Sequence, residues 1–135
     1  MKYLLDTNIC IYLIKRRPES VIRELAKQAV GEVGISTITA AELWHGVVRS
    51  QSVERSRAAL EQFMVPLVIA EFDAAAAIVY GQIRVALERQ GRSIGPFDNL
   101  IAAHALTLGA TLVTNNEREF QRVPGLTVVN WAAGG

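Results

Sequence analysis

The N-terminal stretch Lys2-Tyr3-Leu4-Leu5-Asp6-Thr7-Asn8 limits the possible folds more than any other part of the sequence. Its apolar residues follow one another without polar alternation, as in a strand that is buried on both faces in the middle of a parallel sheet. The run stops at Asp6, where a helix is predicted to begin. Ligands of open α/β sheets bind outside the carboxyl ends of the strands, so Asp6 occupies a position typical of functional residues.

The composition predicts one domain with a partly covered surface. The 135 residues fit a single domain, residues 1–135. Half of them are hydrophobic, only 20% are charged, and the mean hydropathy is +0.22. A chain this apolar is expected to form an oligomer or to bind a partner that covers part of its surface.

The net charge of +1 gives no overall attraction to nucleic acid, so such binding requires a local cluster of basic residues. The densest cluster is Lys15-Arg16-Arg17. It fits contact with phosphates and, equally well, the preference of basic residues for a helix C-terminus.

The single cysteine, Cys10, excludes an internal disulfide framework and fits a reducing compartment. The N-terminus lacks the regions of a signal peptide, and apolar runs such as residues 74–80 are far shorter than the roughly 20 residues of a membrane span. We therefore expect a soluble, cytoplasmic protein with no membrane partner.

Strand and helix patterns alternate along the chain. Strands are predicted before Asp6 and at 33–36, 67–69, 111–114 and 126–129. Helices are predicted at 9–14, 19–30, 37–49, 52–64, 73–90 and 96–108, with a turn or short helix at 115–120. This alternation predicts an α/β fold with a central parallel sheet of about five strands and helices on both faces.

Three acids are expected to meet at the carboxyl edge of this sheet. Asp6 follows the first strand, Glu42 lies in the first turns of the helix after the second strand, and Asp98 lies in the first turn of the helix before the fourth. Asp98 reaches this edge only if its helix runs antiparallel to that strand. Each acid also has a structural explanation: an N-cap for Asp6, a capping box of Thr39 and Glu42, and the helix dipole for Asp98.

Carboxylates that meet at one edge repel one another, and a bound cation or raised pKa values must relieve the repulsion. A hard divalent cation is the simpler relief. Mg²⁺, for which Mn²⁺ can substitute, prefers carboxylates, waters and phosphate oxygens, and it supports phosphodiester hydrolysis. His45 and His104 lack the spacing of zinc ligands and are expected at packing or surface positions.

The segment after the fourth strand is a further candidate. Thr114 ends that strand, Asn116 is suited to hold a metal-bound water or the substrate, and Glu119 adds charge. An Asx-type turn that opens a short helix is the alternative role for Asn116.

Four segments together resemble the PIN-domain ribonucleases, and most closely the VapC toxins of bacterial toxin–antitoxin pairs. The resemblance covers nearly the whole chain. The segments are Leu5-Asp6-Thr7-Asn8, Ser36-Thr37-Ile38-Thr39-Ala40-Ala41-Glu42-Leu43, Gly95-Pro96-Phe97-Asp98-Asn99-Leu100-Ile101-Ala102-Ala103-His104-Ala105 and Thr114-Asn115-Asn116-Glu117-Arg118-Glu119-Phe120.

The resemblance implies a Mg²⁺-dependent endoribonuclease that is dimeric and neutralised by a VapB-like antitoxin. Asp6, Glu42 and Asp98 correspond to the acidic metal-binding residues of the family, and Thr114 to a polar residue of its site. Many relatives carry a fourth acid where this chain has Asn116. The third and fourth segments resemble the VapC group that cuts initiator tRNA in its anticodon loop.

The sequence lacks the motifs of two other kinds of α/β protein. A receiver-like phosphoacceptor lacks its acceptor Asp and late Lys, and a dinucleotide-binding domain lacks a G-x-G-x-x-G after the first strand. A non-catalytic RNA- or partner-binding module with structural Mg²⁺ stays open. For a nuclease, Arg84, Arg89 and Arg92 are candidates for phosphate contacts, although a solvated helix face also explains them.

Overall fold

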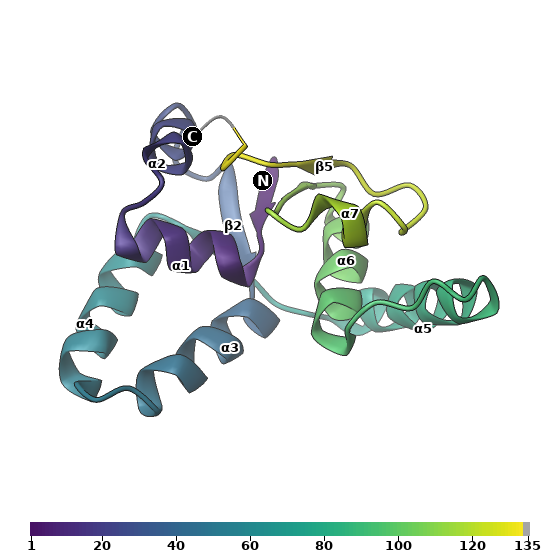
Figure 1. Cartoon of the computed structure of the whole chain (residues 1–135), viewed down its shortest axis with the longest axis horizontal. Helices are drawn as coiled ribbons and strands as arrows, with labels where there is room; N and C mark the ends of the chain where they lie inside the picture. Colours follow the sequence, from purple (N-terminus) through teal and green to yellow (C-terminus); the bar gives the residue numbers. More distant parts are fainter. Residues whose placement is uncertain (134–135) are drawn as a thin grey trace.

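One sheet of five parallel strands forms the centre of the computed structural model, which describes residues 1–133 (Figure 1). Strand β1 (Tyr3–Leu5) lies in the middle and pairs with β2 (Val33–Ser36) and β4 (Thr111–Val113). The edge strands are β3 (Val68–Ala70) and β5 (Val128–Val129). The predicted central parallel sheet, with the N-terminal strand at its middle, is confirmed.

Helices cover both faces of the sheet, because successive side chains of β1 point to opposite sides. Leu4 packs in a core with α5 and α6, whereas Leu5 packs in a second core with α1, α2, α3 and α4. Within residues 1–133, none of the helices combines the length and apolar character that a membrane span requires. The helices are α1 (Thr7–Lys15), α2 (Glu19–Ala26), α3 (Thr37–Val48), α4 (Val53–Met64), α5 (Ala74–Arg89), α6 (Pro96–Leu108) and α7 (Glu117–Phe120).

The second helix is shorter than predicted. It ends at Ala26 instead of Val30, whose side chain is 89% exposed. The N–H groups of Lys2 and Tyr3 both donate to the Glu32 carbonyl, so the chain must leave the helix early to bring Glu32 beside β1. Strand β3 is also displaced by one residue from its predicted range, and β5 covers only the last two of its four predicted residues.

Gly34 of β2 sits where no side chain fits. A Cβ built on it would lie 2.6 Å from the Val68 carbonyl oxygen of β3 and would also clash with the Met1 side chain. Because the carbonyl belongs to a paired strand, the sheet itself would have to shift.

We therefore expect Gly34→Ala to lower the free energy of unfolding by about 1–3 kcal/mol. Thermal and urea unfolding measure the loss. Gly81→Ala is the matched control, because a Cβ at that site in α5 meets nothing within 4 Å and alanine favours the helix. Equal stability of both variants would contradict the predicted clash.

Candidate active site at the carboxyl edge of the sheet

Asp6 lies at the point where the strand order changes direction. From β1 the chain proceeds to β2 and β3 on one side, and β4 and β5 lie on the other. The Asp6 N–H donates to the Val113 carbonyl of β4, and its side chain, 5% exposed, accepts a hydrogen bond from the Ile9 N–H at 2.9 Å. Asp6 is thus the N-cap of α1 and also faces the crevice where α/β proteins bind ligands.

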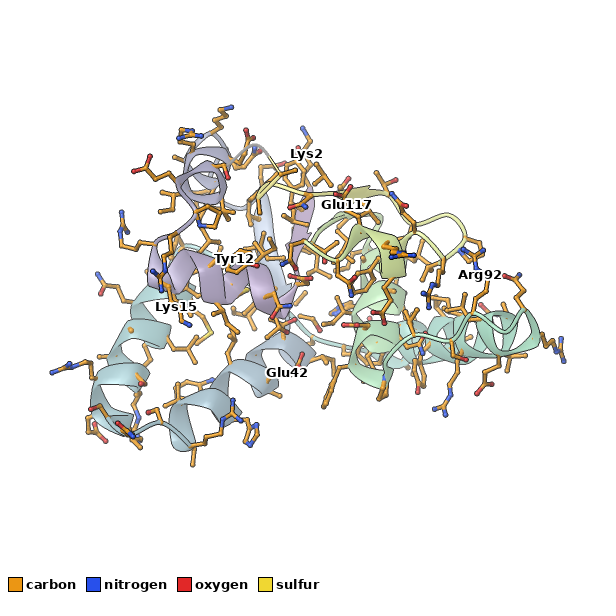
Figure 2. All side chains as sticks on the ribbon, viewed as in Figure 1. Lys2, Tyr12, Lys15, Glu42, Arg92 and Glu117 are labelled. Atoms are coloured by element: carbon orange, nitrogen blue, oxygen red, sulfur yellow. The ribbon has the colours of Figure 1, made fainter. Side chains whose placement is uncertain are left out.

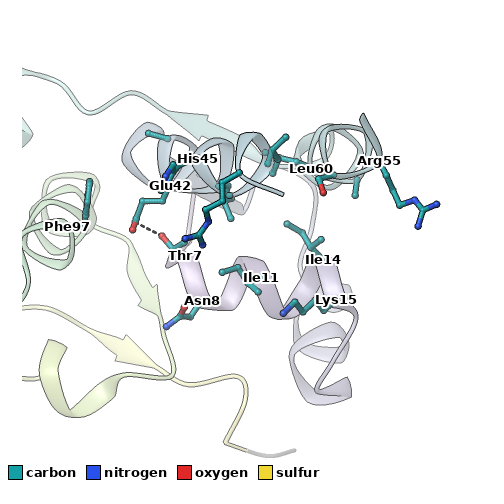
Figure 3. Close-up of a pocket in the computed structure, with 17 residues that line it drawn as sticks. Thr7, Asn8, Ile11, Ile14, Lys15, Glu42, His45, Arg55, Leu60 and Phe97 are labelled. Atoms are coloured by element: carbon teal, nitrogen blue, oxygen red, sulfur yellow. Dashed lines mark hydrogen bonds between the residues drawn. The ribbon is translucent and has the colours of Figure 1, made fainter. Parts of the chain in front are cut away.

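Glu42 reaches the same edge from α3. The N-cap of this helix is Ser36, whose Oγ accepts from the Ile38 N–H at 3.0 Å, so the predicted capping box of Thr39 and Glu42 is wrong. Thr39 lies inside the helix with a buried hydroxyl that has no protein partner. The Glu42 carboxylate accepts a hydrogen bond from Thr7 Oγ1 at 2.7 Å (Figure 3).

Asp98 is the third residue of α6, which begins at Pro96 as predicted. Burial and the neighbouring carboxylates of Glu119, Asp6 and Glu42, in that order, raise the pKa of Asp98 to about 7. Charges act on one another at this strength only when they are close. Asp98 therefore shares the edge with Asp6 and Glu42, as the predicted direction of its helix requires.

Glu119 of α7 has a more central place among the acids than the sequence indicated. Its Oε1 accepts from the Gly95 N–H at 3.0 Å and its Oε2 accepts from Asn116 Nδ2 at 2.8 Å. Burial raises the pKa of Glu119, but these hydrogen bonds and one with Asp98 outweigh it, so the net pKa is lowered. Of the two coupled carboxyl groups, Glu119 therefore has the lowered pKa and Asp98 the raised one.

Asn116 and Thr114 support the acids rather than adding charge. Asn116 starts α7 without a side-chain cap, and its amide is directed to Glu119 instead, so the Asx-type turn is not formed. The buried Thr114 hydroxyl accepts from the Asn116 N–H at 2.9 Å. Burial raises the pKa of Asp6, and a hydrogen bond from the Thr114 side chain partly offsets this shift.

The donor set fits a hard divalent cation. In residues 1–133 no three His, Cys, Asp or Glu side chains are grouped so that they could hold a metal ion as they stand. Thr7, Ile9 and Asn116 each donate a hydrogen bond to one of the carboxylates. Yet burial, followed by the negative charges of Glu119, Asp6 and Glu42, raises the pKa of Asp98 to about 7. Carboxylate oxygens with excess negative charge are what Mg²⁺ or Mn²⁺ binds.

His104 links the helices that carry two of the acids. Its Nδ1 lies 2.8 Å from the Oγ of Ser36, the N-cap of α3, and its ring also hydrogen-bonds to the backbone of Glu71. Burial lowers the pKa of His104, so the neutral ring accepts from Ser36 and donates to Glu71. His104 is a buried packing residue, as expected, and it sets α6 against the start of α3.

The predicted phosphate contacts are Arg84 and Arg89 of α5 and Arg92 of the loop that follows it, and all three are exposed. Arg84 is exposed and donates to the Tyr80 hydroxyl at 2.8 Å, with Glu88 beside it. Figure 2 shows Arg92 well away from Glu42. The solvated helix face is the better description of these arginines.

A groove of about 770 Å³ lies between α1, α3 and α4, and of the four acids it is lined by Glu42. Thr7 and Glu42 stand at one end of it (Figure 3). Apolar side chains including Ile11, Ile14 and Leu60 line its length.

Known proteins share both the sequence and the fold. Residues 3–126 match the family model of the PIN domain. The chain is 48% identical over 132 residues to the tRNA(fMet)-specific endonuclease VapC of Shigella flexneri, covering 98% of this chain and 99% of that protein. It is 44% identical over 132 residues to Ribonuclease VapC2 of Rickettsia felis, with 97% and 98% covered.

Solved structures of VapBC complexes contain chains with a similar fold. DNA-bound VapBC from Salmonella typhimurium includes a chain with a TM-score of 0.91 and 44% identity, covering 97% of this chain and 98% of that one. VapBC2 from Rickettsia felis, bound to a DNA fragment from its promoter, gives a TM-score of 0.89 and 43% identity, covering 97% and 99%.

The raised pKa of Asp98 makes stability depend on pH. Its folded-state pKa of about 7 lies above its ordinary value of 3.8, so the folded protein binds more protons between these values and loses stability as the pH rises through 7. In EDTA, Asp98→Asn removes this loss. We expect the variant to gain about 1 kcal/mol at pH 8, roughly 4 °C in Tm, and nothing at pH 4.

Thermal melting across this pH range measures the effect. Glu61→Gln removes an exposed carboxylate of α4 and serves as the control. A gain for Asp98→Asn that is the same at pH 4 and pH 8 would mean that the acids do not converge.

Proposed function

The chain belongs to the PIN-domain family, and we propose that it is a Mg²⁺-dependent endoribonuclease, the VapC-type toxin of a toxin–antitoxin pair. The observation that supports this best is the meeting of Asp6, Glu42, Asp98 and Glu119 at one sheet edge, where burial and the neighbouring carboxylates raise the pKa of Asp98. We further propose that residues 1–135 form a single domain of this kind.

Each polar side chain has a proposed role. Asp6 and Asp98 hold the Mg²⁺, and Glu42, oriented by Thr7, binds or orients the attacking water. When bound, the ion activates a water and stabilises negative charge on the cleaved phosphate. Mn²⁺ is expected to substitute for it.

Thr114, Asn116 and Glu119 complete the proposed site. The Thr114 hydroxyl orients the Asp6 carboxylate, and Asn116 holds the Glu119 carboxylate next to Asp98. Glu119 takes the place of the fourth acid. Because the pKa of Asp98 is raised and that of Glu119 is lowered, Asp98 is the group that must lose its proton before both carboxylates can bind a cation.

The proposed substrate is tRNA. Proteins named tRNA(fMet)-specific endonuclease VapC share 48% and 44% of their residues with this chain over nearly its full length. We propose that the enzyme cuts initiator tRNA, in its anticodon loop, and therefore acts in the cytoplasm.

The proposed protein partner is a VapB-type antitoxin, because related chains occur in VapBC complexes. The groove between α1, α3 and α4 is the docking surface that we propose for it. Apolar side chains line most of the groove, together with Lys15, Arg49 and Arg55, and a segment bound there reaches Glu42. A second copy of the chain is the proposed partner of exposed apolar side chains such as Ile78 and Val85 of α5.

Asp98→Asn is expected to lower Mg²⁺-dependent RNA cleavage by at least about 100-fold, because it removes a carboxylate that the metal requires. Antitoxin-free protein is incubated with total RNA and with initiator tRNA, in Mg²⁺ or in EDTA, and the released 5′ ends are sequenced. Glu61→Gln should cleave as the parent does. RNA binding without any cleavage by the parent would favour the non-catalytic module instead.

Ala59→Trp tests the docking surface. Ala59 is exposed on α4 and lines the groove, whereas its neighbour Ala58 is exposed but does not line it. The indole of Ala59→Trp fills the groove and is expected to weaken antitoxin binding at least tenfold, while Ala58→Trp leaves it unchanged. Calorimetric titration with the antitoxin measures both, and equal affinities would place the antitoxin elsewhere.

A further inference from the structure

The exposed face of α1 forms a continuous stripe that begins beside the acids. Asn8, Ile11, Tyr12 and Lys15 lie on this face at helical spacing. The opposite face is buried in the core; its residues are Ile9, Cys10 and Leu13. From Asn8, two residues after Asp6, the stripe runs roughly 10 Å along the helix axis. Figure 2 shows Tyr12 and Lys15 successively along α1.

A shallow hollow of about 430 Å³ lies at the far end of the stripe. Ile11, Tyr12, Lys15, Arg17 and Pro18 line it, so its charged side chains are all basic. In residues 1–133 neither Lys15 nor Arg17 forms a salt bridge. Compensation of the helix dipole explains Lys15 alone, because Arg17 lies beyond the end of α1 and still lines the same hollow.

The Tyr12 ring is fixed in place by the loop that carries part of the acid site. Its hydroxyl accepts a hydrogen bond from Asn115 Nδ2 at 2.6 Å, and Asn115 lies between Thr114 and Asn116. The ring is half-buried against the core of α1 to α4, so one part of it remains open. A fixed aromatic surface beside unpaired cations is the arrangement on which proteins bind single-stranded RNA, by stacking of bases and attraction of phosphates.

The charge of the acid site makes such a surface necessary. Carboxylates repel the phosphates on either side of a cut, so the RNA strand must be held by cations nearby. Arg84 of α5 pairs with Glu88, whereas Lys15 lies in the last turn of the helix that Asp6 caps and Arg17 lies two residues beyond its end.

We propose that the stripe and hollow are a subsite for the RNA strand next to the cleaved phosphodiester. Tyr12 stacks on a base, and Lys15 and Arg17 contact phosphates. This subsite rests on the proposed ribonuclease function and adds to it the residues that hold the strand.

The test compares two double variants that each remove two positive charges. Lys15→Ala with Arg17→Ala alters the hollow, and Arg23→Ala with Lys27→Ala alters basic residues of α2 that pair with Glu19 and Glu24. Binding of a labelled anticodon stem-loop RNA is measured in the Asp98→Asn background at several salt concentrations. Cleavage is measured in the otherwise unaltered protein, and thermal melting confirms that each variant folds.

We expect the hollow variant to bind at least tenfold more weakly and to lower the slope of log K against log salt by about 1.4, or 0.7 per lost phosphate contact. Tyr12→Ala should weaken binding roughly tenfold without changing the slope. In the cleavage assay, the hollow variant and Tyr12→Ala should each raise KM more than they lower kcat. The α2 variant should match the parent in every assay.

Three results would overturn the subsite while leaving the ribonuclease intact: parent-like binding by the hollow variant, an equal loss in the α2 variant, or a loss of antitoxin binding alone. A parent protein that neither binds nor cleaves RNA would overturn the proposed function, and the subsite with it.

Discussion

Repulsion between carboxylates is the constraint around which this structure is arranged. Asp6, Glu42, Asp98 and Glu119 approach one another at the carboxyl edge of a parallel sheet, and burial, followed by the charges of Glu119, Asp6 and Glu42, raises the pKa of Asp98 to about 7. Each of the other three has a local donor: the Ile9 N–H, the Thr7 hydroxyl, or the Gly95 N–H with the Asn116 amide. The donors fix the positions of the acids but do not neutralise them. The remaining charge is available to a cation.

The topology brings the acids together without long loops. Asp6 directly follows β1, and Glu42 lies in the helix that follows β2. Asp98 comes from α6, because a helix that leads into a parallel strand starts at the carboxyl end of the sheet. The fold does not by itself set the angle between α3 and α6. The buried contact of Ser36 with His104 joins the first turn of α3 to the middle of α6 and so helps to fix Glu42 relative to Asp98.

The sequence predicted those structural features that are set by residues close together in the chain. The buried strand before Asp6, the start of α6 at Pro96 and the sheet edge shared by the acids all follow from local patterns. The end of α2 did not, because Val30 has an apolar side chain that favours the helix while the pairing of β1 with Glu32 ends it. The contact of Ser36 with His104 joins residues 68 positions apart, and no local pattern signals it.

Asn116 and Glu119 act together at the carboxyl edge of the sheet. The Asn116 side chain is an amide and adds no charge to the site. Glu119 lies three residues further on, inside α7, and Asn116 precedes the helix as its N-cap. The Asn116 amide donates to the Glu119 carboxylate, and the Gly95 N–H holds its other oxygen. The fourth negative charge is therefore kept next to Asp98 by a residue pair instead of a single acid.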